Sequence, residues 1–114
     1  MFRSDRTNHR IAEMDQREAL TKLREYRALL EPHFQIADMY LYGSFATGQQ
    51  RDHSDIDVAV VVNSIPDDHL AQLALLWRLR RQVDFRIEPI LLESGNDPSG
   101  FLSQIRSQGI AVPA

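Results

Sequence analysis

The chain has 114 residues, of which 43% are hydrophobic and 25% are charged, as is usual for one globular domain. Its formal net charge of -3 creates no positive field that would attract nucleic acid, and the absence of cysteine excludes disulfides and thiolate metal sites. No apolar run reaches the roughly 20 residues of a membrane span, and the polar start lacks the apolar core of a signal peptide, so we expect a cytoplasmic protein.

The N-terminal part predicts an arm followed by a helix. Residues 1–13 lack periodicity and are expected to form a flexible arm ahead of a single domain, residues 14–114. From about Met14 onward, apolar residues recur at helical spacing, with arginines and glutamates between them. Pro32 predicts the end of this helix, or a kink close to it.

Two strands and a short turn occupy the middle of the chain. Residues 36–42 predict a short strand that Gly43 ends, and a brief helical turn follows until Gly48. Residues 58–62 are apolar at every position, which predicts a central strand covered on both faces.

Residues 66–82 predict a helix with one buried side. Asp67 or Asp68 supplies its start and the early negative charge that suits the helix dipole. Three arginines are expected to form a solvated end of the helix, with contact to an acidic partner as the alternative: Arg78, Arg80 and Arg81. Four residues are expected to form its buried stripe: Leu70, Leu73, Ala74 and Trp77.

The C-terminal part predicts a third strand, a short helix and a possible last strand. Residues 83–92 predict a strand, because apolar and polar side chains alternate over residues 83–88. Asp97 is a plausible cap and Pro98 a first helical residue for a helix that ends before Gly109, with residues 110–112 extended after it. The order of elements predicts an α/β or α+β domain with a single mixed β-sheet flanked by helices.

Asp55 and Asp57 lie two residues apart at the start of the central strand. In an extended segment their side chains share one face, where two negative charges repel unless a cation lies between them. Hard ions such as Mg²⁺ prefer such oxygen ligands. An isolated pair would more often be a solvated strand start, but this pair lies at the mouth of an apolar strand, where open sheets place ligands.

Gly43 and Ser44 lie where a strand passes into a helical turn. Glycine allows the backbone to approach a phosphate closely, and Ser44 offers a hydroxyl beside helical N–H donors. Most Gly-Ser pairs are simply turns, so this pair gains meaning only from the aspartates that follow it.

The arrangement Gly-Ser, ten residues, Asp-x-Asp and an apolar strand resembles the DNA polymerase β-like nucleotidyltransferase superfamily, and in particular its minimal nucleotidyltransferase (MNT) domains. The resemblance covers most of the chain, because the order of strands and helices matches the whole minimal domain. It is carried by Gly43, Ser44, Gly48, Ser54, Asp55, Ile56 and Asp57.

The resemblance implies a third acid on the strand after the intervening helix. Asp84 is favoured by the "VDL" triplet usual in these domains, here "VDF". Glu88 is favoured by its distance from the closing helix and by the "PILL" run after it. We expect Glu88, with Asp84 as the open alternative.

The resemblance also implies a mechanism. Two Mg²⁺ ions would be held by Asp55, Asp57 and Glu88, and Gly43 and Ser44 would bind the phosphates of a nucleoside triphosphate, ATP by expectation. The product would be a nucleoside monophosphate on an acceptor, with pyrophosphate leaving.

Similar MNT proteins act as antitoxins beside a helical HEPN partner, so the resemblance implies a partner protein as acceptor; a homo-oligomer is the other expectation. Two other functions stay open at this point. One is an inactive binding module that masks a partner, and the other is a phosphohydrolase that uses the same acids.

The chain departs from the family pattern at one position. Many relatives carry an arginine just before the second glycine of the motif, Gly48, where this chain has Thr47.

Overall fold

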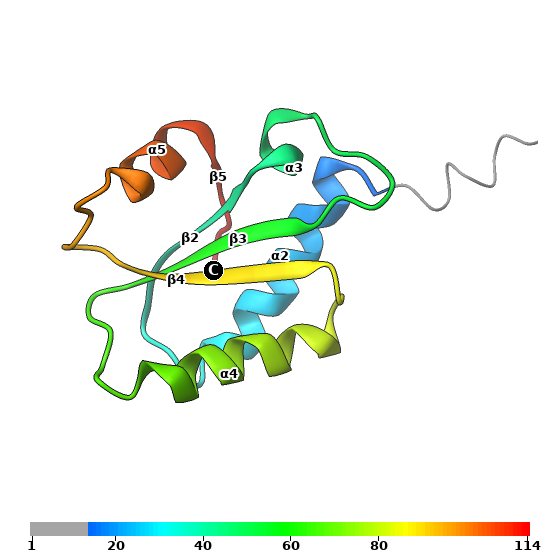
Figure 1. Ribbon diagram of the computed structural model, residues 1–114. Coiled ribbons are helices and arrows are strands. Elements are labelled where there is room, and N and C mark those ends of the chain that lie inside the picture. Colours follow the sequence, from blue (N-terminus) through cyan, green and yellow to red (C-terminus); the bar gives the residue numbers. More distant parts are fainter. Residues whose placement is uncertain (1–13) are drawn as a thin grey trace, which may run out of the picture.

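The computed structural model describes residues 14–114 as a four-stranded mixed sheet with helices on both faces (Figure 1). The arm predicted for residues 1–13 lies outside the described residues. The strands lie in the order β4-β3-β2-β5, with β3 antiparallel to β2 and parallel to β4. They are β2 (Ile36–Tyr42), β3 (Ile56–Val62), β4 (Ile87–Glu93) and β5 (Ile110–Ala111). The predicted single mixed sheet is confirmed.

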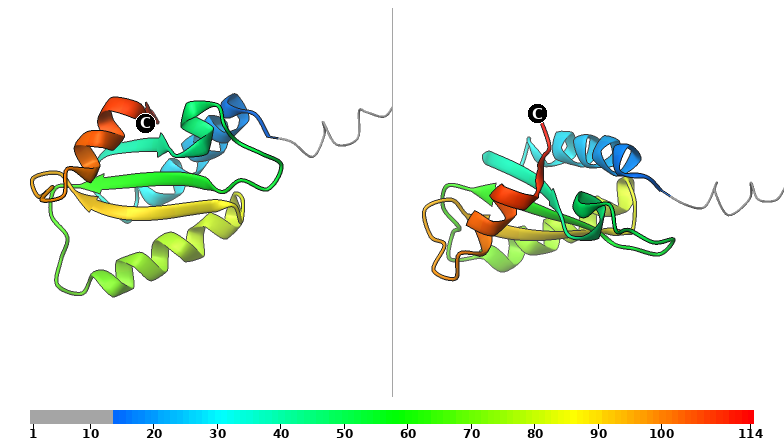
Figure 2. Two further views of the ribbon diagram at one scale, coloured as in Figure 1. Left: turned by 45° about the horizontal axis from the view of Figure 1, so that its top comes forward. Right: turned by 90° about the horizontal axis from the view of Figure 1, so that it is seen from above.

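The helices lie on opposite faces of this sheet. α2 and α4 cover one face, and α5 lies on the other, as the view along the sheet shows (Figure 2). A 3₁₀ turn, η1 (Arg80–Gln82), continues α4. The helices are α2 (Gln16–Leu30), α3 (Ser44–Thr47), α4 (His69–Leu79) and α5 (Phe101–Gln108). Within residues 14–114, no helix is both long and apolar enough to cross a lipid bilayer.

α2 begins and ends where its sequence indicates. Asp15 accepts a hydrogen bond from the Glu18 N–H at 2.8 Å, and the Glu18 side chain accepts one from the Asp15 N–H at 3.3 Å. This capping box satisfies two N–H groups at the start of the helix. The helix ends at Leu30, just before Pro32, as predicted.

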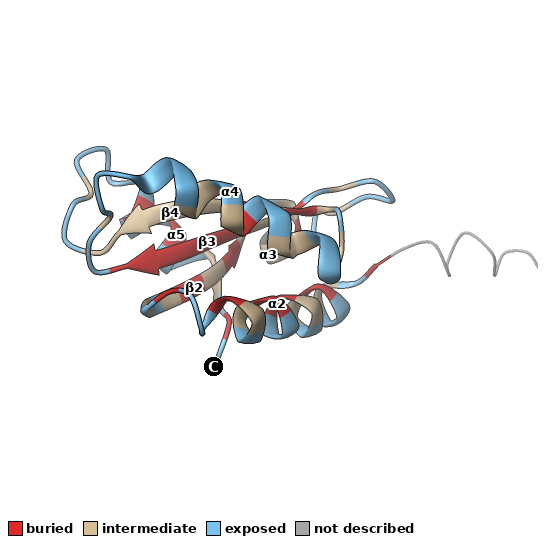
Figure 3. Ribbon diagram, turned by 90° about the horizontal axis from the view of Figure 1, so that it is seen from below, coloured by how far each residue is buried: buried red, intermediate tan, exposed pale blue. Residues whose placement is uncertain are grey.

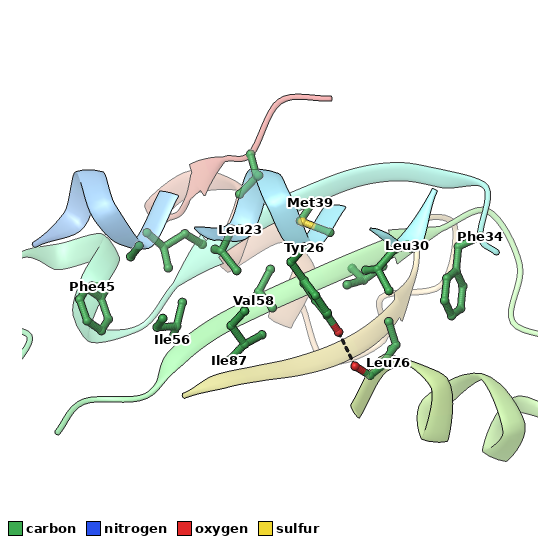
Figure 4. Close-up of a cluster of buried hydrophobic side chains, with 14 of the residues drawn as sticks. Leu23, Tyr26, Leu30, Phe34, Met39, Phe45, Ile56, Val58, Leu76 and Ile87 are labelled. Atoms are coloured by element: carbon green, nitrogen blue, oxygen red, sulfur yellow. Dashed lines mark hydrogen bonds between the residues drawn. The ribbon is translucent and has the colours of Figure 1, made fainter. Parts of the chain in front are cut away.

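The main core lies between the sheet and the helices α2 and α4. Val58 and Val60 of β3 belong to this core, whereas Ala59 and Val61 face the side that α5 occupies; all four are fully buried (Figure 3). β3 is therefore the central strand covered on both faces that its apolar sequence predicts. Tyr26 of α2 reaches across the core (Figure 4) and its hydroxyl donates a hydrogen bond of 2.7 Å to the Leu76 carbonyl of α4.

The predicted buried stripe of α4 is wrong for most of its residues. Leu76 is the fully buried residue of α4, and Leu73 and Leu79 pack partly against the core. Leu70 is 73% exposed and Trp77 39% exposed. α4 carries apolar residues on more than one side, so their spacing alone does not determine which side faces the sheet.

The predictions for the C-terminal elements need two corrections. β4 begins at Ile87 rather than at residue 83, because residues 83–86 form turns in which the Ile87 N–H donates to the Asp84 carbonyl. α5 begins at Phe101, so Pro98 is not its first residue. Asp97 still caps this helix from outside, because its carboxylate accepts hydrogen bonds from the N–H groups of residues 102 and 103.

Candidate active site

A row of polar side chains crosses three strands of the sheet. Asp57 of β3 pairs with Tyr42 of β2 on one side and with Glu88 of β4 on the other. Paired residues on neighbouring strands point to the same face, so these three side chains lie together. Val58 belongs to the core beneath the sheet, so Asp57 and its neighbours lie on the opposite face, the one that α5 partly covers.

Asp55 joins this row from just outside β3. It precedes the first residue of the strand and is exposed, while Asp57 is half-buried. Burial raises the pKa of Glu88, and so do the negative charge of Asp55, a hydrogen bond with Asp55 and the charge of Asp57; Arg80 acts in the opposite direction. The structure thus brings together Asp55, Asp57 and Glu88, the three carboxylates that the sequence indicates.

The cluster holds more negative charge than its surroundings neutralise. Burial raises the pKa of Asp57, and the charge of Asp55 raises it further. Burial also raises the pKa of Tyr42 to about 12, with smaller contributions from the charges of Asp57 and Glu88. Repelling carboxylates of this kind are stabilised by a bound cation.

These residues suit a magnesium ion in their chemistry. Asp55, Asp57 and Glu88 all offer carboxylate oxygen, the ligand that Mg²⁺ prefers. Burial raises the pKa of Asp57 and of Glu88 most, and the neighbouring negative charges, which a divalent ion would neutralise, raise them further. Within residues 14–114, no three His, Cys, Asp or Glu side chains already have the arrangement of a metal site. Asp55, Asp57 and Glu88 therefore lie near one another without having the geometry of a complete metal site.

Gly43 allows the chain to pass directly beside Asp57. Its φ of +75° and ψ of -151° lie in a region that residues with a Cβ rarely adopt. A Cβ at this position would also collide with Oδ2 of Asp57. Glycine is therefore required here both by the backbone conformation and by the space that the carboxylate occupies.

α3 follows Gly43 at once and places Ser44 at the edge of the cluster. Gly48, with a φ of +76°, ends this short helix, as predicted. The Thr47 hydroxyl donates hydrogen bonds to the carbonyls of Gly43 and Ser44 and so stabilises the turn. The side-chain amide of Gln16, in α2, fixes the position of this turn by donating hydrogen bonds to the carbonyls of residues 45 and 46.

A cavity of about 380 Å³ lies between α3 and α5, next to this row. Tyr42, Gly43 and Ser44 line it from the sheet and α3, and Phe101 lines it from α5. The rings of Tyr42 and Phe101 meet edge to face with 5.9 Å between their centroids. A larger hollow of about 1060 Å³ lies beside residues 50–54, but none of the three clustered carboxylates lines it.

Residues 24–113 match the family described as polymerase beta, nucleotidyltransferase. The chain belongs to this family. The match includes both strands that carry the carboxylates, the Gly43–Ser44 turn and α5. No curated protein matches the sequence significantly.

Two solved structures share the nucleotidyltransferase fold. One is a proposed nucleotidyltransferase from Sulfolobus solfataricus, with a TM-score of 0.61 and 19% sequence identity over 97% of this chain and 89% of that one. The other is a toxin-antitoxin structure with AMP-PNP, with a TM-score of 0.61 and 24% identity over 83% of this chain and 73% of that one. At these identities the likeness establishes the fold.

Asp84, the alternative third acid of this nucleotidyltransferase domain, lies away from the cluster. Its carboxylate pairs with Lys22 at 3.4 Å and with Arg86 at 3.1 Å, and it accepts a hydrogen bond from the Arg86 N–H at 2.8 Å. Burial alone would raise the pKa of Asp84, but the hydrogen bonds and charge of Arg86, with the charge of Lys22, lower it. Asp84 is therefore paired with two cations, whereas burial and the neighbouring carboxylates keep the pKa of Glu88 raised.

The positions of Tyr42 and Arg80 do not follow from the sequence. Tyr42 lies two residues before Ser44 on β2, and only the strand pairing places it beside Asp57. Arg80 was expected in solvent, but its guanidinium donates hydrogen bonds to the carbonyls of Phe85 and Ile87 and acts on Glu88. The position of Tyr42 depends on strand pairing, and the contacts of Arg80 depend on the turns between α4 and β4.

Proposed function

We propose that this protein is a Mg²⁺-dependent nucleotidyltransferase that transfers AMP from ATP to an acceptor group on a partner protein. The observation that carries the proposal is the position of Asp55, Asp57 and Glu88 beside the Gly43–Ser44 turn. Family membership supports the reaction class. The nucleotide in the toxin-antitoxin neighbour, AMP-PNP, supports ATP as the substrate.

In this reaction the carboxylates bind metal ions and the Gly43–Ser44 turn binds phosphate. Asp55, Asp57 and Glu88 would hold two magnesium ions, which supply charge stabilisation for the triphosphate and for the attacking oxygen. Ser44 binds phosphate oxygens through its hydroxyl, and Gly43 keeps the backbone close to them. The acceptor hydroxyl attacks the α-phosphorus, the bond to pyrophosphate breaks, and Glu88 would accept the hydroxyl proton.

We place the protein in a toxin-antitoxin pair, as the antitoxin that modifies its toxin in the cytoplasm. The fold is shared with a protein solved as a toxin-antitoxin, which supports a protein partner. A helical, HEPN-like toxin is the partner that the resemblance to MNT domains implies.

One observation favours a second function, an inactive module that masks its partner by binding alone. In residues 14–114 the acidic side chains do not meet as a finished metal site. A domain of this kind could keep the fold and bind a partner without transferring a nucleotide.

Label transfer from ATP separates these functions. The protein is incubated with Mg²⁺, ATP labelled at the α-phosphate, and the product of the neighbouring gene. We expect label on the partner, and none when the protein carries Asp55→Asn with Asp57→Asn. Asp52→Asn, an exposed acid in the preceding loop, is the matched control and should transfer normally.

Three other results would contradict the transferase. Binding of the partner by the wild-type chain without any transfer assigns the masking function. Release of phosphate from ATP without label on protein assigns a phosphohydrolase. Transfer that survives the double substitution removes Asp55 and Asp57 from the reaction.

A further inference from the structure

α4 has a second apolar face that residues 14–114, the part described by the structure, leave exposed. Leu76 faces the core, whereas Leu70 is 73% exposed and Trp77 39% exposed. Ala71 and Ala74 are exposed between them. We call these four residues the outer face of α4: Leu70, Ala71, Ala74 and Trp77.

The spacing of the outer face is that of a helix prepared to pack against another helix. Leu70, Ala74 and Trp77 recur at steps of four and three residues, so they form one continuous stripe along α4. Ala74 lies between the two large side chains, where a small residue allows a second helix to come close. The guanidinium of Arg80 lies 4.6 Å from the centre of the Trp77 ring and holds it in place.

Charges of opposite sign lie at the two ends of this stripe. Asp67 and Asp68 precede the helix, and Arg78 and Arg81 lie at its other end; all four are exposed. The salt bridges found within residues 14–114 include none of these four side chains. The ends therefore carry charge that the rest of the described chain does not neutralise by direct pairing.

The arrangement is self-complementary. Asp67 lies seven residues before Ala74 and Arg81 seven after it, while Leu70 and Trp77 lie four before and three after. In an antiparallel pair of α4 helices related by a two-fold axis at Ala74, each acidic end meets a basic end. Each Leu70 meets the Trp77 of the other copy. A symmetric dimer requires such a surface, because the same patch must complement itself.

We propose that the outer face of α4 binds a second copy of this chain in an antiparallel, two-fold dimer. Two features select a second copy over an unrelated helix, namely the charge reversal along α4 and the small residue at its midpoint. α4 has 11 residues and is about 16 Å long. A contact of that length is small, so the dimer is weak and depends on concentration.

This dimer goes beyond the proposed transferase and does not depend on it. Leu76 of α4 packs on the Val58 side of the sheet, whereas Asp57 and Glu88 lie on the other side. The residues of the outer face are exposed, whereas Leu76 is buried in that core, and Figure 3 shows that α4 has both exposed and buried parts. Both carboxylate clusters of a dimer therefore stay open to nucleotide and partner.

Charge exchange between two variants tests the dimer directly. One variant carries Asp67→Arg and Asp68→Arg, and the other Arg78→Asp and Arg81→Asp. Each alone places like charges opposite one another, so we expect at least a tenfold weaker dimer by sedimentation equilibrium. An equimolar mixture should associate as the wild type does, because every contact in the mixed dimer again joins opposite charges.

Two further variants control for folding and net charge. Arg17→Asp with Arg24→Asp, on the exposed side of α2, changes the charge by the same amount and should leave the dimer intact. Ala74→Gln adds bulk at the axis without charge and should weaken the dimer. Asp68 makes no side-chain capping bond, so its replacement removes none; far-UV circular dichroism checks that each variant folds.

Three outcomes would overturn the proposal. A wild-type chain that stays monomeric at millimolar concentration has no such interface. A dimer that neither charge variant weakens uses another surface. Two weakened variants that do not associate when mixed show that the charges do not pair across an antiparallel axis; if they also lose a different protein partner, the face belongs to that partner.

Discussion

Gly43 links a single backbone conformation to the position of a carboxylate. Gly43→Ala adds a Cβ where Oδ2 of Asp57 lies, at a backbone geometry already unfavourable for alanine. We expect it to lower the free energy of unfolding by about 1–3 kcal/mol and to displace Asp57, with loss of nucleotide transfer. Urea denaturation and the label-transfer assay measure the two effects.

Gly48→Ala is the matched control for this substitution. Gly48 has nearly the same φ, +76°, but nothing lies within 4 Å of a Cβ placed there. It should cost about 1 kcal/mol through backbone strain alone and leave transfer intact. Equal loss of transfer in both variants would mean that the turn matters only through its conformation.

Glu88 and Asp84 should respond oppositely to loss of their charge. Glu88→Gln removes one of three repelling carboxylates, so without metal it should raise the melting temperature, while transfer falls by more than about 100-fold. Asp84→Asn breaks the pairs with Lys22 and Arg86 and should cost about 1–2 kcal/mol of stability with transfer retained. Thermal unfolding and initial transfer rates distinguish them.

The reverse pattern would make Asp84 the third acid. A chain with Asp84→Asn that is stable but inactive, beside a Glu88→Gln chain that transfers normally, would contradict the assignment of Glu88.

The pairing of Asp84 also predicts how stability changes with pH. Its pKa is lowered in the folded chain, so the ionised group contributes stability that is fully present above the unfolded pKa of about 4. This contribution is lost as the pH falls through the lower folded pKa. The difference in unfolding free energy between wild type and Asp84→Asn should therefore shrink below about pH 4. Urea titrations at several pH values measure it, and a constant difference would contradict the pairing.

At the scale of elements, one buried hydrogen bond joins the two helices that cover the core. Tyr26 of α2 donates to the Leu76 carbonyl of α4, and burial raises the pKa of its hydroxyl well above the ordinary value. Tyr26→Phe keeps the ring but leaves that carbonyl without this donor. We expect a loss of about 1 kcal/mol in unfolding free energy, measured by urea denaturation. An unchanged midpoint would show that another group replaces the hydroxyl.

The elements that sequence predicts well are those with a single strong signal. The apolar runs that end at glycine or follow aspartate predict β2 and β3, and α2 ends at Leu30, shortly before Pro32. α4 was predicted as a helix, but its orientation was not, since both its core side and its outer side are apolar. The start of β4 was misplaced because residues 83–86 alternate like a strand while hydrogen bonds hold them in turns.

At the scale of the whole molecule, the sheet topology brings together carboxylates that their spacing in the sequence does not. Asp55 and Asp57 were placed together by sequence, because they lie two residues apart. Glu88 joins them only because β4 lies parallel to β3 in a register that pairs it with Asp57. Asp84 and Glu88 looked equivalent on one long predicted strand, and the turn before Ile87 separates them.

The exposed side of α4 gives the chain an optical probe of its own. Trp77 is the sole tryptophan of the sequence, and it lies at the outer face with its ring partly in water. Its emission therefore reports on the surroundings of one helix, free of contributions from other indole groups. Contact with an apolar side chain of another molecule would shift that emission to shorter wavelength.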